Sequence, residues 1–420
     1  MKEGLAGYIP PKGEWTPVDE ALYGVEDIYN VEPKKAKRLR EDAIRYSFKH
    51  HYEGNKFYHE YCKKRDVKPD DIKTEGDLNK IPLIPGTFFK GYPDIKEDGG
   101  KEFIHWLEKI YTGKFPKTEI KGKKPSYDDI IEGLTKKNIY LTVSSGRTGK
   151  FSIIPRDRLT YFRSQYSSLS GFRTYLFNIK AKDVCIFTTL PDPLESNYVG
   201  SKIWEPIISL NSSTIFREDH GGRIYRKKLF SSHIKSLSRG EKEKKKLILL
   251  STPSILDPFM DYMEKRRMKF NFDGFAAFYG GWINDKGEKI YSEGLEKRIN
   301  ENFGIPQENC RDWFIMNELN GHGVECEGGY KHLPYFIHPM VLDEEMNFLP
   351  CGEWGRLAFI DPLANSYPGF IMTEDRVKIL ENCPECDRKG KVLDPEISKV
   401  RKEIKGCAAI LGRALERGGR

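Results

Sequence analysis

The stretch Ser-Ser-Gly-Arg-Thr-Gly-Lys at residues 144–150 decides how this sequence is interpreted. It follows the apolar run IYLTV at 139–143 and precedes a second one, FSIIP at 151–155, so we expect a loop between two strands. Its small residues allow backbone N–H groups to close around an anion, and Arg147 and Lys150 add positive charge. The Walker pattern is excluded, because no Gly-Lys-Ser/Thr leads into a helix. The stretch therefore predicts a phosphate-binding loop, with a Ser- and Gly-rich hairpin turn as the alternative.

Around this loop, short apolar runs alternate with longer amphipathic stretches. Apolar runs at 184–190, 247–250 and 275–279 are separated by helical patterns such as 158–177 and 254–267. This alternation predicts an α/β fold with mixed, mainly parallel sheets covered by helices. After about residue 330 the spacing shortens, which indicates antiparallel strands. We expect a large domain over residues 1–376, mostly helical in its first 125 residues, and a small C-terminal segment at 377–420.

Composition excludes several classes of protein. The 420 residues carry 70 Lys and Arg against 62 Asp and Glu, a net charge of +8, which is too small to indicate a nucleic-acid partner. The longest aliphatic run, at 247–250, is far shorter than the ~20 residues of a membrane helix, and the N-terminus lacks the apolar region of a signal peptide. We therefore expect a cytoplasmic protein without a membrane span. The basic stretch 227–246 predicts a solvated helix, with a nucleic-acid-binding patch as the alternative.

Further motifs follow in a fixed order: IPLIP at 81–85 with Phe89-Lys90, Tyr-Gly-Gly-Trp at 279–282, FIMNE at 314–318, and Thr-Glu-Asp at 373–375. As an ordered set over residues 80–410 they resemble the acyl-protein synthetases of bacterial bioluminescence, the luciferin-component ligases, within the adenylate-forming (acyl-CoA synthetase) superfamily. Phenylacetate–CoA ligases are the next nearest relatives. Arg147 stands where the superfamily usually has Thr, and Glu374 where it usually has Gly. These departures put the rate and the nucleotide preference in doubt.

The resemblance implies ATP-dependent activation of a carboxylic acid, in the first place a fatty acid, as an acyl-adenylate with release of pyrophosphate. The acyl group would then pass to a thiol, and a protein cysteine is favoured over CoA. An acyl-CoA or aryl-CoA ligase is the alternative, and a nucleotide-binding module without turnover is an alternative of another class. The implied partners are the acid and an acyl-accepting or reductase protein, whereas the oligomeric state is not indicated.

The same resemblance implies ATP and Mg²⁺ as cofactors and assigns roles to residues. Glu318 would be the Mg²⁺ ligand, as a hard oxygen donor to a hard cation. Phe314 would stack on the adenine, Asn317 would lie near the α-phosphate, and Asp375 would accept hydrogen bonds from the ribose. Lys150 and Glu318 would act in catalysis. The remaining nucleotide contacts would be Ser144, Ser145, Gly146, Arg147, Thr148, Gly149, Gly280, Gly281 and Trp282.

The expected acyl acceptor is Cys407, which lies 13 residues before the end of the chain. Neighbouring Lys402 and Lys405 would favour its thiolate, which is the reactive form. The alternative is a small buried residue, because the apolar run Ala-Ala-Ile-Leu follows it. The C-terminal segment is shorter than the mobile domain of most acyl-CoA synthetases and has no clear match for their catalytic lysine.

The pair of cysteines in Cys383-Pro-Glu-Cys386 has the spacing of a metal-binding turn. Cys326 and His332 would complete a tetrahedral Zn²⁺ site, with His338 and Cys351 as alternative partners. A turn that binds no metal is the other interpretation. A zinc ion here would pin the C-terminal segment to the main domain.

Overall fold

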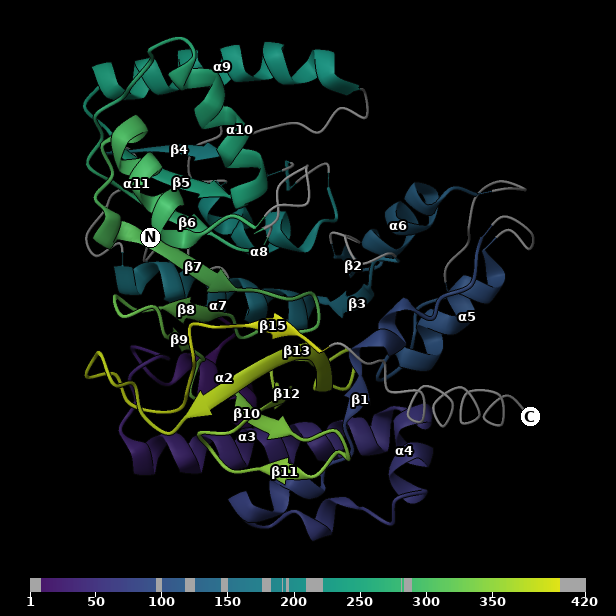
Figure 1. The fold of residues 1–420 in the computed structure, drawn as a ribbon. Coiled ribbons are helices and arrows are strands. Elements are labelled where there is room, and N and C mark those ends of the chain that lie inside the picture. The colour runs from purple at the N-terminus through teal and green to yellow at the C-terminus, as the bar shows by residue number, and fades with distance from the viewer. Residues whose placement is uncertain are drawn as a thin grey trace.

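The structure is a computed structural model of the chain (Figure 1). It describes residues 9–95, 100–117, 125–144, 150–175, 183–190, 192–193, 196–208, 222–280, 282 and 289–400. Within this part, the strands form one sheet of 13 strands and a separate pair.

The described residues of the N-terminal third are largely helical. Its helices are α2 (Pro17–Tyr23), α3 (Pro33–Gly54), α4 (Lys56–Lys63), α5 (Lys101–Ile110) and α6 (Tyr127–Thr135). Short 3₁₀ turns lie between them: η1 (Lys12–Glu14), η2 (Pro69–Asp71), η3 (Glu75–Lys80) and η4 (Gly86–Lys90). Asn55 separates α3 from α4, because its side chain accepts a hydrogen bond from the backbone of Tyr58 at 2.8 Å and so caps the second helix.

Four parallel strands form one end of the large sheet, with β4 at its edge. They are β4 (Val184–Thr188), β5 (Lys246–Ser251), β6 (Gly274–Phe278) and β7 (Cys310–Phe314), which follows η7 (Gln307–Asn309). Their side chains alternate between two cores, as the pleat requires. Phe187 and Phe278 pack toward α9 (Gly222–Lys242), α10 (Pro253–Glu264) and α11 (Ser292–Phe303), whereas Ile186 and Ala277 join the core that contains α7 (Arg158–Tyr175) and α8 (Val199–Ile208).

The second half of the large sheet is mainly antiparallel, as the shortened spacing after residue 330 predicted. It contains β8 (Gly323–Glu325), β9 (Lys331–His332), β10 (His338–Leu342), β11 (Phe348–Leu349), β12 (Trp354–Ile360), β13 (Phe370–Leu380), β14 (Val392–Leu393) and β15 (Ser398–Lys399). The IPLIP segment contributes β1 (Ile84–Pro85), which pairs with β13 in parallel. The domain boundary expected at 376/377 falls inside β13.

A short hairpin of β2 (Ile139–Val143) and β3 (Ile153–Asp157) stands apart from the large sheet. Figure 1 shows it beside the carboxyl ends of the parallel strands. The two strands flanking the glycine-rich loop are therefore confirmed, and so is the mixed α/β fold. The loop residues 145–149 themselves lie outside the described part.

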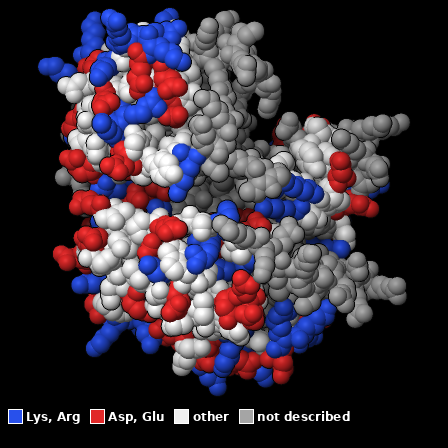
Figure 2. Space-filling model, viewed as in Figure 1, with Lys and Arg blue, Asp and Glu red and all other residues white. Residues whose placement is uncertain are grey.

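The surface adds two observations. No helix in the described ranges has the length and apolar character needed to cross a membrane. Figure 2 shows Lys and Arg side chains on the end of the molecule formed by α9, with acidic side chains among them. Lys235, Arg239 and Lys242 are exposed there, as on a solvated helix.

Candidate active site

The base of the glycine-rich loop is closed by hydrogen bonds between its two flanking strands. The backbone N–H of Ser152 donates to the Ser144 hydroxyl at 2.8 Å, and the Ser144 N–H donates to the Ser152 carbonyl at 3.2 Å. The amide of Asn317 joins them from the other side, since its nitrogen donates at 3.1 Å to the carbonyls of Thr142 and Ser152. The turn after β7 is thereby fixed against the base of the loop.

Arg156 on β3 holds the same turn from within the protein. Its guanidinium is 2% exposed and donates to the carbonyl of Asn317 at 2.7 Å, to the side chain of Asn320 at 3.1 Å and to the Thr142 hydroxyl. A buried cation raises the local positive potential, which favours phosphate and carboxylate groups nearby. Sequence reasoning missed Arg156, because it lies in a strand and belongs to none of the motifs.

Glu318 follows Asn317 and is half-buried. Burial raises the pKa of its carboxyl, whereas a hydrogen bond from the Ser152 hydroxyl and the charges of Lys90 and Arg156 oppose that shift. Its backbone carbonyl accepts from the Tyr367 hydroxyl at 3.2 Å. Glu318 therefore presents a carboxylate next to the loop base and between two cations.

Lys90 reaches this place from η4, far away in the sequence. Its ammonium lies 3.1 Å from the Glu374 carboxylate on β13 and contributes to the charge environment of Glu318. The pairing of β1 with β13, through Ile84 and Ile371, sets this position. Sequence reasoning used Lys90 only as part of a motif, and its role as a site residue was missed.

Lys150, at the far end of the loop, contacts the 81–95 segment instead of the Glu318 cluster. Its ammonium donates to the carbonyl of Tyr92 and lies 3.7 Å from the centre of the Tyr92 ring. Burial lowers its pKa. The catalytic role expected for Lys150 stays a prediction.

The carboxyl ends of β6 and β7 carry the residues expected to bind adenine. Phe314 is half-buried at the end of β7, and Gly280 follows β6 with a φ of +50°, a conformation that favours glycine. Trp282 packs edge-on against Phe278 with ring centres 5.6 Å apart, and its side chain hydrogen-bonds to Asp312. One carboxylate oxygen of Asp312 lies 3.3 Å from the Lys331 ammonium, and the other is buried without a hydrogen-bond partner. The motif search did not single out Asp312.

Asp375, the expected ribose ligand, lies on β13 and is 6% exposed. Its backbone N–H donates to the Thr373 hydroxyl at 3.0 Å, and its carboxylate pairs with Lys399 of β15 at 2.8 Å. The last described strand therefore contacts the expected ribose site directly.

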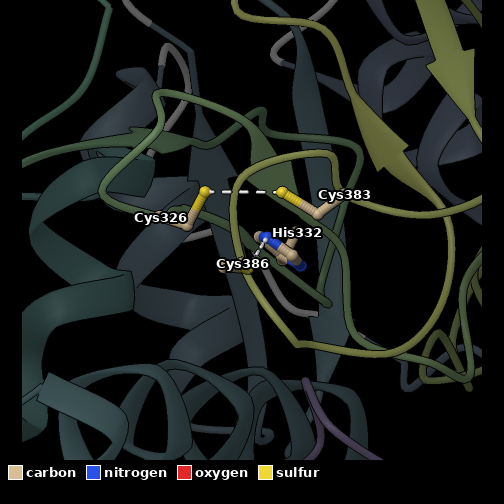
Figure 3. A group of neighbouring side chains, drawn as sticks. All are labelled: Cys326, His332, Cys383 and Cys386. Carbon is tan, nitrogen blue, oxygen red and sulfur yellow. Dashed lines mark hydrogen bonds between the residues drawn. The ribbon is translucent and has the colours of Figure 1, made fainter.

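Four side chains expected to bind zinc lie together (Figure 3). The ligand atoms of Cys326, His332, Cys383 and Cys386 all lie within 4.8 Å of one another. The alternative partners His338 and Cys351 are not in this cluster. Cys351 hydrogen-bonds to Glu381 and Lys391 instead.

Six of the expected site residues lie outside the described part, in the loop and after Gly280: Ser145, Gly146, Arg147, Thr148, Gly149 and Gly281. Cys407 also lies outside it. Apart from Lys150 and the Cys/His cluster, the remaining expected residues form three groups: the loop base with Glu318, the ends of β6 and β7, and Asp375 on β13, which pairs with Lys399. Lys90 links the first group to the third.

The sequence profile of one family, described as "Acyl-protein synthetase, LuxE", matches residues 18–101 and 133–416. The chain belongs to the acyl-protein synthetase family. It is 24% identical over 389 residues to the long-chain-fatty-acid–luciferin-component ligase of Aliivibrio fischeri, covering 91% of this chain and 90% of that protein. The ligase of the same name from Vibrio harveyi is 23% identical over 407 residues, covering 95% of this chain and 94% of that protein.

Solved structures agree on the fold of this acyl-protein synthetase. An open conformation of 2-hydroxyisobutyryl-CoA ligase superposes with a TM-score of 0.60 at 15% identity, covering 89% of this chain and 71% of that one. The same ligase in its postadenylation state gives a TM-score of 0.61 at 14% identity, covering 96% of this chain and 76% of that one. The expected fold and family are both confirmed.

Family membership also confirms the expected reaction class. This acyl-protein synthetase is an ATP-dependent ligase that forms an acyl-adenylate and transfers the acyl group to a thiol. In the described part, Lys90, Arg156 and Glu318 place fixed charges beside the base of the glycine-rich loop.

Proposed function

We propose that this acyl-protein synthetase activates a long-chain fatty acid and transfers it to its own Cys407. A carboxylate oxygen of the acid attacks the α-phosphorus of ATP, the α–β phosphoanhydride bond breaks, and pyrophosphate leaves. The thiolate sulfur of Cys407 then attacks the acyl carbon. The acyl–phosphate bond breaks, and AMP leaves with the bonding electron pair. Both curated relatives are named for long-chain fatty acids, which supports this class of acid.

One observation carries the proposal: segments far apart in the sequence meet around one carboxylate. Ser152 at the loop base hydrogen-bonds to Glu318, and Lys90 lies between Glu318 and Glu374. Adenylation brings the negative charges of the acid and the triphosphate together. We infer that Lys90 and Arg156 offset this charge from fixed positions, which is the larger part of catalysis in such reactions.

The protein groups also fit a magnesium ion. Glu318 is an oxygen donor beside the loop base, and a single carboxylate together with substrate phosphates is the usual way in which proteins bind Mg²⁺. Bound there, Mg²⁺ would neutralise charge on the phosphates. The flat face of Phe314 suits the adenine ring. The Asp375 carboxylate suits the ribose hydroxyls, which would replace its pairing with Lys399.

Chain length supports Cys407 as the acyl acceptor. β15 ends at Lys399 and pairs with Asp375 of the proposed ribose site, and Cys407 follows eight residues later in the sequence. Eight residues span at most roughly 26–29 Å when extended. This length is compatible with a role of Cys407 at the proposed adenylate site.

The test separates the two half-reactions. ATP–pyrophosphate exchange is measured with acids from acetate and phenylacetate to long-chain fatty acids, and labelled acyl transfer to the protein is measured as thiol-sensitive label. We expect exchange to be fastest with long-chain acids. Cys407→Ser should keep exchange and lose stable labelling, whereas Cys351→Ser, which changes a half-buried cysteine of the described part, should keep both.

Other outcomes would identify the alternatives. Thiol-sensitive labelling that survives Cys407→Ser would assign the acceptor to another cysteine. Release of acyl-CoA on addition of CoA, with no labelled protein, would identify a CoA ligase. ATP binding without exchange for any acid would identify a nucleotide-binding module.

A further inference from the structure

The Cys/His cluster (Cys326, His332, Cys383 and Cys386) brings together two parts of the chain that the proposed reaction does not use. Cys326 follows β8 and His332 ends β9, so both belong to one hairpin. Cys383 and Cys386 lie in the connection from β13 to β14. The four side chains converge from these two loops (Figure 3).

The distances fit ligands of one tetrahedral ion. The sulfurs of Cys326 and Cys383 are 3.8 Å apart, and the Cys386 sulfur lies 3.3 Å from Nε2 of His332. Two sulfurs at a zinc–sulfur distance of ~2.3 Å in a tetrahedral site lie about 3.8 Å apart. A disulfide would require about 2.05 Å. The observed spacing therefore matches metal ligands better than a covalent bond.

The surroundings of the sulfurs also resemble a metal site. Backbone N–H groups of Gly328 and Tyr330 hydrogen-bond to the Cys326 sulfur, and that of Arg388 hydrogen-bonds to the Cys386 sulfur. Such bonds stabilise thiolates and orient them toward a cation. Arg388 is also tied to Asp27 of the N-terminal part by a 3.1 Å ion pair.

The two loops pack too closely for an ordinary residue at position 328. A Cβ atom on Gly328 would lie 2.3 Å from the Cβ of Glu385, inside the Cys383–Cys386 turn. Glycine thus allows the hairpin turn to reach the second pair of ligands. This close approach is an observation independent of the sulfur distances.

We infer that Cys326, His332, Cys383 and Cys386 bind one structural zinc ion. Three thiolates and one imidazole form a closed Cys₃His set, which leaves no position for a substrate. The ion fastens the β13–β14 connection to the β8–β9 hairpin. It thereby fixes the strands β14 and β15, from which the chain continues toward Cys407.

The test uses the full-length protein, purified under reducing conditions without chelator, and measures bound metal by elemental analysis. We expect one zinc ion per chain. A variant carrying both Cys383→Ser and Cys386→Ser should lose it, and Cys351→Ser should keep it as the matched control. Full zinc content in the double variant would overturn the assignment, as would iron in place of zinc.

A second measurement covers the case in which the double variant fails to fold. The wild-type protein is stripped with a strong chelator and titrated with Co²⁺. Thiolate-to-cobalt charge-transfer bands and strong tetrahedral visible bands that saturate at one equivalent would support the site. Their absence in folded protein would overturn it. Metal content is read separately from ATP–pyrophosphate exchange, so this inference and the proposed reaction stand or fall independently.

Discussion

Among single residues, the half-buried carboxyl of Glu318 affects the free energy of unfolding through its pKa. Burial raises its pKa above the ordinary value for glutamate, although Ser152, Lys90 and Arg156 oppose the shift. Between the ordinary and the raised pKa, the folded protein binds more protons than the unfolded chain. The free energy of unfolding therefore falls as the pH rises through this window, and the ionised carboxylate is destabilising at neutral pH.

Glu318→Gln should abolish ATP–pyrophosphate exchange, because the amide cannot serve as a charged ligand for Mg²⁺. The same change should leave the melting temperature at pH 7 unchanged or raise it, since no buried negative charge remains. Exchange assays and thermal unfolding at pH 7 measure the two effects. Glu308→Gln, at an exposed position in η7, is the control and should alter neither. Exchange that persists in Glu318→Gln would refute the ligand assignment.

Lys90 provides the second prediction for a single residue. Lys90→Met should lower the exchange rate about 100-fold or more, the usual effect of losing one preorganised charge-stabilising group. Glu374→Gln removes only the partner 3.1 Å away and should cost much less, because the ammonium then remains. Steady-state exchange rates of the two variants measure this difference. Equal losses in both variants would mean that Lys90 acts through the ion pair alone.

At the scale of elements, hydrogen bonds from outside the β2–β3 hairpin hold it in place, since it forms no ladder with the large sheet among the described strands. Asn317 and Arg156 link it to residues 317–320, and the Ser366 hydroxyl donates to the Pro155 carbonyl at 2.8 Å. The base of the glycine-rich loop, at Ser144 and Ser152, is thus fixed by Asn317. Strand pairing inside the hairpin sets the register of its two strands.

Asn317→Ala should therefore lower the free energy of unfolding by about 1–3 kcal/mol, because two buried carbonyls lose their shared donor. It should also raise the KM for ATP more than it lowers kcat, since the loop base is no longer fixed. Denaturant unfolding and exchange kinetics measure these effects. A stability loss with an unchanged KM would show that the loop is positioned without Asn317.

At the scale of the whole molecule, the N-terminal helices are joined to the nucleotide-binding part by a buried ion pair. Asp19 of α2 and Arg163 of α7 lie 2.8 Å apart, with side chains 3% and 1% exposed. Asp19 also accepts hydrogen bonds from Thr16 at the start of α2. Removing one partner leaves an unpaired charge in the interior. The free-energy cost of that charge is larger than the stabilisation that the intact pair provides.

Asp19→Ala should lower the free energy of unfolding by about 3–5 kcal/mol, while the exchange rate per folded molecule stays near the wild-type value. Lys49→Ala, which removes one partner of an exposed pair with Glu53, should change stability by no more than about 0.5 kcal/mol. Urea unfolding followed by tryptophan fluorescence compares the two. A small effect of Asp19→Ala would mean that water or a neighbouring group compensates Arg163.

The sequence alone determined the strands around residues 144–150, the strands β4, β5 and β6, the antiparallel half and the family. These features depend on side-chain periodicity and on short motifs, which are local properties of the chain. It also selected the four cysteine and histidine residues that meet in the structure. It did not identify Asp312 and Arg156, because no local sequence pattern marks a buried polar residue in a strand.

Only the tertiary structure decided which residues share one place. Lys90 meets Glu374, and Cys326 meets Cys383, across separations of 284 and 57 residues. Strand pairing explains both contacts. β1 pairs with β13, which brings Lys90 to Glu374, and β14 pairs with β9, which brings the two cysteines together. Such pairings follow from the packing of the whole core, since many registers satisfy the same local pattern. The physical reason is that periodicity specifies which face of a strand is buried, whereas its neighbour is chosen by the entire fold.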